Sequence, residues 1–146
     1  MFDTILCPVD FSGASEEAAR YGVSLADSLG ATKVVFIHVY QRPIYPLPDG
    51  TLFMDGTSEA AVKTQLRRQL EGLASRYSAH AFEAVPELHE GVPHRVITEH
   101  AADLGAALIV MATHGRTGLG HMLLGSVAEK VVRLSTVPVC TVPVRG

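Results

Sequence analysis

Short apolar runs alternate with amphipathic segments along most of this chain, and this alternation limits the fold more than any other feature. The apolar runs are Thr4–Val9, Lys33–Val39, Ala107–Ala112 and Val137–Val142, with Ala84–Glu90 as a weaker fifth candidate. Each run has the length of a buried strand, and helical patterns separate the runs. Alternation of this kind predicts parallel strands joined by right-handed helical crossovers.

The segments between these runs carry apolar residues at helical spacing, which predicts amphipathic helices. In the first helix, Glu16 and Glu17 suit the initial turn and Gly30 suits the end. The apolar positions of this helix are Ala14, Ala18, Leu25 and Leu29. The later helices are expected at Val62–Tyr77, Pro93–Leu104 and about Met122–Leu134. We therefore expect an α/β domain with one parallel sheet and helices on both faces. Pro86 places its strand at a sheet edge, because proline lacks a backbone donor.

Composition predicts a single globular domain and argues against two classes of partner. The 146 residues are 47% hydrophobic and 18% charged, which is typical of a chain that folds around a core. A formal net charge of -3 gives no basic field, so we expect no nucleic-acid partner. No stretch approaches the roughly 20 apolar residues of a membrane span. Cys7 and Cys140 lie inside apolar runs, which predicts buried, reduced thiols in a cytoplasmic protein.

One long irregular segment, Tyr40–Thr57, interrupts the alternation. It contains three prolines and an Asp-Gly pair, and it is longer than the roughly 12 to 15 residues usual for an unstructured loop inside a domain. Since it follows a strand, it leaves from the carboxyl edge of the sheet, where open α/β folds bind ligands. We expect this segment to cover a binding site.

A second irregular segment, Ala112–Ser126, is rich in glycine and lies between a predicted strand and a predicted helix. Glycines allow the backbone to approach a ligand closely, and N–H groups at a helix start favour anions such as phosphate. Arg116 can make bidentate contacts and Ser126 offers a hydroxyl donor. The alternative is a connection whose glycines serve turn geometry alone, since no Walker lysine is present. His114 could contact phosphate or simply shape the turn.

These residues resemble the ATP-binding branch of the universal stress protein family, whose signature is Gly-x2-Gly-x9-Gly followed by Ser or Thr. Gly115, nine intervening residues, Gly125 and Ser126 fit this signature, while Ala112 replaces its first glycine. The resemblance extends over nearly the whole chain. Its other matching segments are Ile5–Ser12, His38-Val39 and Val137–Val139.

The resemblance implies a Rossmann-like, adenine nucleotide alpha hydrolase-like sheet with strand order 3-2-1-4-5, and ATP as the ligand. Mg²⁺ is expected through the phosphates of ATP rather than through a protein cage. The residues implied around adenine are Pro8, Val9, Asp10 and Val39; those implied around ribose and phosphates are Ala112, Gly115, Gly125, Ser126 and Val127; and His114, Arg116 and Gly118 complete the loop. The alternative for Asp10 is a helix-capping or turn carboxylate beside Ser12. The resemblance also implies a homodimer through the last strand.

Several functions remain open at this level. The leading hypothesis is a stress-response regulator or sensor that acts through nucleotide-dependent conformation or assembly. The alternatives are a slow ATP hydrolase, a module of the same family that binds no nucleotide, and a phospho-acceptor receiver domain, for which the chain lacks an acidic pair after the first strand. His89, His94 and His100 have no recognised zinc spacing, which favours surface histidines and no protein metal site.

Overall fold

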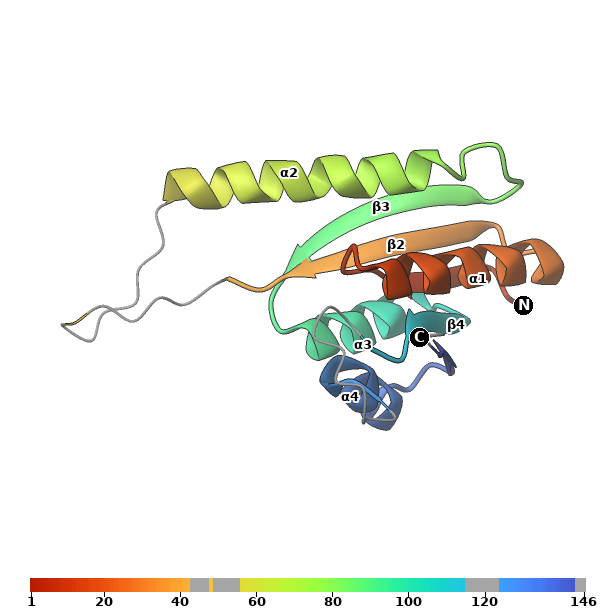
Figure 1. Cartoon of the computed structure of the whole chain (residues 1–146). Helices are drawn as coiled ribbons and strands as arrows, with labels where there is room; N and C mark the ends of the chain where they lie inside the picture. Colours follow the sequence, from red (N-terminus) through yellow and green to blue (C-terminus); the bar gives the residue numbers. More distant parts are fainter. Residues whose placement is uncertain (43–47, 49–55, 115–123, 144–146) are drawn as a thin grey trace.

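The computed structural model describes residues 1–42, 48, 56–114 and 124–143, which build one parallel sheet covered by helices on both faces (Figure 1). The sheet has five strands in the order β3-β2-β1-β4-β5. The strands are β1 Thr4–Pro8, β2 Lys33–Tyr40, β3 Glu83–Glu90, β4 Leu108–Ala112 and β5 Val139–Val142. The predicted fold class and strand order are confirmed. This order differs from the 2-1-3-4-5 arrangement of receiver domains, so the receiver alternative fails at the level of topology.

Two helices cover each face of the sheet. The helices are α1 Gly13–Leu29, α2 Gly56–Ser75, α3 Pro93–Leu104 and α4 Ser126–Leu134. On one face, α1 and α2 pack through residues such as Val23 and Leu70 against Cys7 and Phe36 of the strands. On the opposite face, α3 and α4 pack against alternate strand residues, among them Leu6 and Ile109 (Figure 1). Burial on both faces accounts for the uniformly apolar character of the central strands.

Gly30 and Pro93 lie at the helix ends that the sequence predicts, and the structure adds Ser12 as a further cap. Ser12 is the N-cap of α1, where its hydroxyl accepts a hydrogen bond from the backbone N–H of Ser15. Gly30 ends α1 with φ 72°, in the left-handed region that favours glycine. Pro93 occupies the first turn of α3, as expected for a residue without a backbone donor. Leu29 differs from the prediction because it is exposed rather than part of the buried face.

The structure also corrects the extent of several elements. Helix α4 begins at Ser126 rather than near Met122, because Gly125 is extended and its N–H donates to the carbonyl of Thr113. Helix α2 begins at Gly56, earlier than the apolar pattern indicates, because the residues before Val62 lack the large apolar side chains that mark that pattern. In the part of the chain that the structure describes, no helix is both long enough and apolar enough to cross a bilayer.

Charged side chains bracket the irregular segment between β2 and α2. Arg42 lies 3.1 Å from Glu59, and Lys63 lies 2.8 Å from Glu90 and 3.4 Å from Glu59. The hydrogen bond between Lys63 and Glu90 raises the pKa of Lys63 and lowers the pKa of Glu90. These ion pairs join Arg42, which precedes the segment, and α2, which follows it, to the end of β3. The predicted cover itself falls largely on residues 43–47 and 49–55, outside the described residues.

Close contact between α1 and the sheet yields a stability prediction at Gly22. A Cβ at this position would lie 2.6 Å from Sγ of Cys7 and 3.5 Å from Val110, and both partners are fully buried. We expect Gly22→Ala to destabilise the protein by about 1–3 kcal/mol, because the helix must move off the sheet. Chemical denaturation at constant m-value would measure this change.

The matched control is Gly72→Ala, in an exposed part of α2 where an added Cβ meets nothing within 4 Å. This variant should gain about 0.5–1 kcal/mol from helix propensity. Cys7→Ala combined with Gly22→Ala should cost less than the two single changes together, because the obstructing sulfur is gone. Equal effects of Gly22→Ala and Gly72→Ala would refute the proposed contact.

Candidate functional site

The carboxyl ends of β1 and β4 lie side by side at the point where the strand order reverses. The two strands pair in parallel, with Ile5 opposite Leu108 and Leu6 opposite Ile109. From β1 the chain continues into α1 on one face, and from β4 it continues towards α4 on the other face. The two connections diverge from this point, which is where open α/β sheets bind ligands. The segments after Pro8 and after Ala112 therefore form the candidate site.

The turn after β1 is built around the carboxylate of Asp10. Its Oδ1 accepts a hydrogen bond from the backbone N–H of Ser12 at 3.0 Å and another from the Ser12 hydroxyl. The backbone N–H of Asp10 donates to the hydroxyl of Ser15, 3.2 Å away. The turn role that was the alternative for Asp10 is therefore present. Because the carboxylate is only partly buried, the same arrangement also holds it at the rim of the site.

His38 supports the same turn from the neighbouring strand. Its Nδ1 lies 2.7 Å from the carbonyl oxygen of Val9, and since a carbonyl only accepts, Nδ1 carries the hydrogen. The ring also contacts Phe11 at a centroid distance of 4.8 Å. Phe11 has φ 64°, an uncommon conformation for a bulky residue. The His38 contacts thus hold a strained turn beside Asp10.

His38 is not among the site residues predicted from sequence. The signal for it is its position next to the last residues of β2, at the carboxyl edge that also presents Val39. Its hydrogen bond to Val9 crosses from β2 to β1, between residues far apart in the chain. A pattern within one strand carries no information about such a partner.

The turn after β4 is drawn together by backbone hydrogen bonds. The N–H of Thr113 donates to the carbonyl of Val142 in β5, and the carbonyl of Thr113 accepts from the N–H of Gly125 at 2.6 Å. His114 follows, with its Nδ1 3.0 Å from the Thr113 hydroxyl. These bonds place the start of α4 directly at the end of β4. The intervening Gly115, Arg116 and Gly118 lie outside the described residues.

The helices that follow β1 and β4 differ at their N-termini. Helix α1 is capped by the Ser12 side chain, whereas the N-cap of α4 is Gly125, which has no side chain, and α4 has no side-chain cap hydrogen bond among the described residues. Ser126, the first residue of α4, is exposed. Among the described residues no side chain caps the first N–H groups of α4, and a helix start of this kind favours an anion.

The remaining predicted residues are mostly packed into the walls of the site. Pro8, Val9, Val39 and Ala112 are buried, each leaving at most a small part of its surface exposed. Such residues can offer a ligand their backbone groups and a narrow apolar rim, but few side-chain contacts. Val127 is partly buried against the core cluster beneath α4. The structure thus gathers the described members of the predicted site at one edge.

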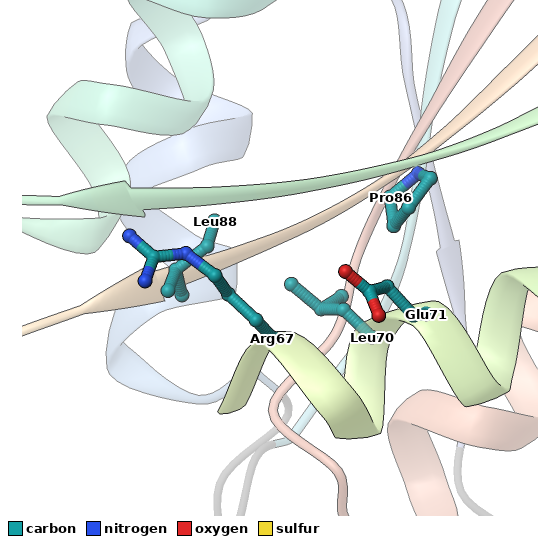
Figure 2. Close-up of a pocket in the computed structure, with 5 residues that line it drawn as sticks. All are labelled: Arg67, Leu70, Glu71, Pro86 and Leu88. Carbon is teal, nitrogen blue, oxygen red and sulfur yellow. The ribbon is translucent and has the colours of Figure 1, made fainter. Parts of the chain in front are cut away.

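A shallow hollow of about 150 Å³ lies elsewhere, between α2 and β3 (Figure 2). The side chains of Leu70 and Leu88 form its apolar floor, and Arg67 and Glu71 stand at its rim, with Pro86 closing one side. These residues belong to the packing of α2 on the edge strand. The hollow is separate from the β1 and β4 ends, and its residues do not converge on a ligand position.

Comparisons with known proteins agree with this geometry. The sequence model of the family described as "Universal stress protein family" matches residues 1–143. Universal stress protein MJ0577 of Methanocaldococcus jannaschii is 31% identical over 155 aligned positions, which cover 97% of this chain and 95% of that protein. A solved structure of MJ0577 superposes with a TM-score of 0.86 at 29% identity, covering 100% of this chain and 99% of the other.

More distant solved structures share the fold. A universal stress protein family protein from Arabidopsis thaliana with AMP bound has a TM-score of 0.69 at 16% identity, and covers 99% of this chain and 93% of its own. A universal stress protein in complex with cAMP has a TM-score of 0.66 at 22% identity, with 96% of both chains covered. The match of the family model over nearly the full length, together with the MJ0577 relationship, shows that this chain belongs to the universal stress protein family.

Proposed function

We propose that this protein binds ATP at the β1 and β4 ends and acts as a regulator or sensor through nucleotide-dependent conformation or assembly. The observation that carries the proposal is the N-terminus of α4. Its N-cap residue is Gly125, it has no side-chain cap hydrogen bond among the described residues, and it lies at the topological switch point. The neighbouring Asp10 turn supplies a carboxylate suited to the hydroxyl or amino groups of a nucleoside.

Adenine nucleotides are the ligand class that the relatives favour. The Arabidopsis protein carries AMP and another family member carries cAMP. Triphosphate specificity rests on Gly115, Arg116, Gly125 and Ser126, since a long glycine loop with a cation suits several phosphates. Mg²⁺ would enter with the phosphates of the nucleotide and neutralise part of their charge.

The described site residues favour binding over rapid turnover. Around the ends of β1 and β4 the described part of the chain supplies one carboxylate, Asp10, which is held in its own turn. Fast phosphoryl transfer uses a lysine, a metal-binding carboxylate and a base or water-positioning residue together. Slow hydrolysis is the second candidate, with His114 beside the phosphate loop as the residue able to exchange a proton.

The first test is ATP binding to Gly125→Val. Gly125 has φ -68° and ψ 166°, which a β-branched residue adopts readily, so the variant should fold. Its side chain would occupy the space directly in front of the α4 N-terminus. Calorimetry on nucleotide-free protein should give a micromolar or tighter Kd for the natural chain, and an affinity at least about tenfold lower for the variant.

The matched control is Gly13→Ala at the start of α1, where an added Cβ meets nothing within 4 Å. This helix start is capped by Ser12, so ATP affinity should stay unchanged. Gly115→Val provides a second substitution within the same signature. The assignment of the ATP site is wrong if the natural chain does not bind ATP, or if Gly125→Val binds ATP as tightly as the natural chain.

His38→Ala tests the support of the Asp10 turn. The substitution removes the donor to the carbonyl of Val9, a residue that is 5% exposed, and should cost about 1–3 kcal/mol of stability. ATP affinity should fall as well, because the turn that orients Asp10 loosens. His94→Ala, at a partly exposed position on α3, is the control and should change neither quantity. Denaturation and calorimetry would measure both, and unchanged stability would refute the role of His38.

We also propose a homodimer through β5, whose four residues are all partly exposed at the sheet border. The carbonyls of Pro138 and Val142 point to β4, so alternation turns the backbone groups of Val139 and Thr141 outward. Light scattering should give twice the chain mass, and Val139→Pro with Thr141→Pro should abolish the dimer, because proline removes both outward donors. A monomeric natural chain, or a dimer that survives both prolines, would exclude this pairing.

Antiparallel pairing centred on Cys140 makes a sharper test of the same dimer. Val139 would then face Thr141 of the partner subunit, and the two Cys140 thiols would meet across the twofold axis. The oxidant diamide should crosslink the natural chain and the Cys7→Ser variant, while Cys140→Ser should stay uncrosslinked. Cys7 is excluded because burial raises the pKa of its thiol to about 12.

Both cysteines are free, which suits the cytoplasmic location that we propose.

A further inference from the structure

A second group of chemically active side chains lies on the other side of β2 from the β1 and β4 ends. Glu87 and His89 are alternate residues of β3 and project from the face that α3 covers, and His100 comes from α3 itself. Nε2 of His100 lies 2.9 Å from Oε2 of Glu87, and Nε2 of His89 lies 3.6 Å from Oε1 of the same carboxylate. The two imidazole rings are 4.4 Å apart. The proposed nucleotide site uses none of these residues.

The donor atoms of these residues are grouped tightly enough to share one ion. One ligand atom from each residue can be chosen so that all three lie within 4.8 Å of one another. In a tetrahedral zinc site, bonds of about 2.0–2.1 Å place the ligand atoms about 3.4 Å apart. Metal binding would require the side chains to close this difference. It would also replace the His100–Glu87 hydrogen bond with two metal bonds.

The residue types select the class of ion. Two imidazole nitrogens and one carboxylate suit Zn²⁺ and similar transition metals, whereas Mg²⁺ and Ca²⁺ require six or more oxygen ligands. The side chains of Glu87, His89 and His100 are 28%, 31% and 18% exposed. An ion can therefore enter from solvent and retain water at a fourth position.

The backbone that carries these side chains is well fixed. Strand β3 pairs with β2 along its whole length, and His89 lies opposite Val39. Helix α3 is anchored by Ile97 and Ala101, which are 3% and 0% exposed. Rigid elements hold metal ligands better than loops do, and they reduce the entropy lost on binding.

We propose that Glu87, His89 and His100 form a binding site for a divalent transition metal of the Zn²⁺ type. The ion links edge strand β3 to α3 and stabilises the folded chain by an amount that grows with the logarithm of the free ion concentration above Kd. The sequence gives no zinc spacing because the third ligand comes from the next element along the chain. His89 and His100, which the sequence predicts to be surface histidines, are partly exposed and in contact with each other.

The experiment titrates the tag-free, metal-stripped full chain with Co²⁺ alone, in nucleotide-free buffer. A saturable visible absorption band of one ion per chain is expected, because Co²⁺ in a low-coordinate nitrogen and oxygen site absorbs strongly. Zn²⁺ should displace the band and raise Tm, while Mg²⁺ should do neither. His89→Gln, His100→Gln and Glu87→Gln should each weaken Co²⁺ binding at least about tenfold.

His94→Gln and Glu99→Gln, on the same helix, are the matched controls and should bind Co²⁺ like the natural chain. Proton NMR of the natural chain gives an independent readout, in which Zn²⁺ should shift the ring signals of His89 and His100 before those of other histidines. Absence of saturable Co²⁺ absorption would overturn the proposal. Undiminished binding by the His89→Gln/His100→Gln double variant would overturn it as well, by placing the ion elsewhere.

Discussion

The parallel pairing of β1 between β2 and β4 is the constraint on which the rest of the structure depends. Ile5, Leu6 and Cys7 of β1 are 0% exposed, so helices must cover both faces of the sheet at its centre. Covering both faces requires the chain to leave β1 and β4 in opposite directions. The switch point between those exits is therefore a consequence of burying the central strand, and the close approach of α1 at Gly22 has the same origin.

The N-termini of α1 and α4 present different chemical groups at the candidate site. Helix α1 satisfies its own N-terminus through Ser12, and the Asp10 carboxylate is fixed as part of that cap. Helix α4 is preceded by its N-cap Gly125, whose N–H donates to the carbonyl of Thr113, just after β4. One end therefore presents a fixed acceptor and the other presents backbone donors. A nucleoside phosphate, with hydroxyl donors at one end and anionic oxygens at the other, matches that polarity.

Local patterns in the sequence predict the elements well, because strand and helix periodicity and the capping residues act within a few positions. Gly30 and Pro93 confirm this at two helix ends. The start of α4 is predicted too early because Gly125 is held extended by Thr113, through a bond across the loop. His38 and the Glu87, His89 and His100 group escape prediction for a related reason, since their contacts join different elements. The strand order follows from the family resemblance rather than from periodicity.

The two edges of the sheet differ in the features that block pairing with another strand, and this difference bears on assembly. The backbone N–H groups of Glu83 and Gly91 donate towards β2. Because the backbone groups of a strand point to alternate sides, those of position 86 point away from the sheet, where Pro86 offers no N–H donor to another strand. Arg42 and Lys63 add charge at the end of that strand. The β5 edge from Val139 to Val142 has neither proline nor charge within it. An unprotected edge normally requires a cover, and a second copy of the same strand is a cover that is always available at the same concentration.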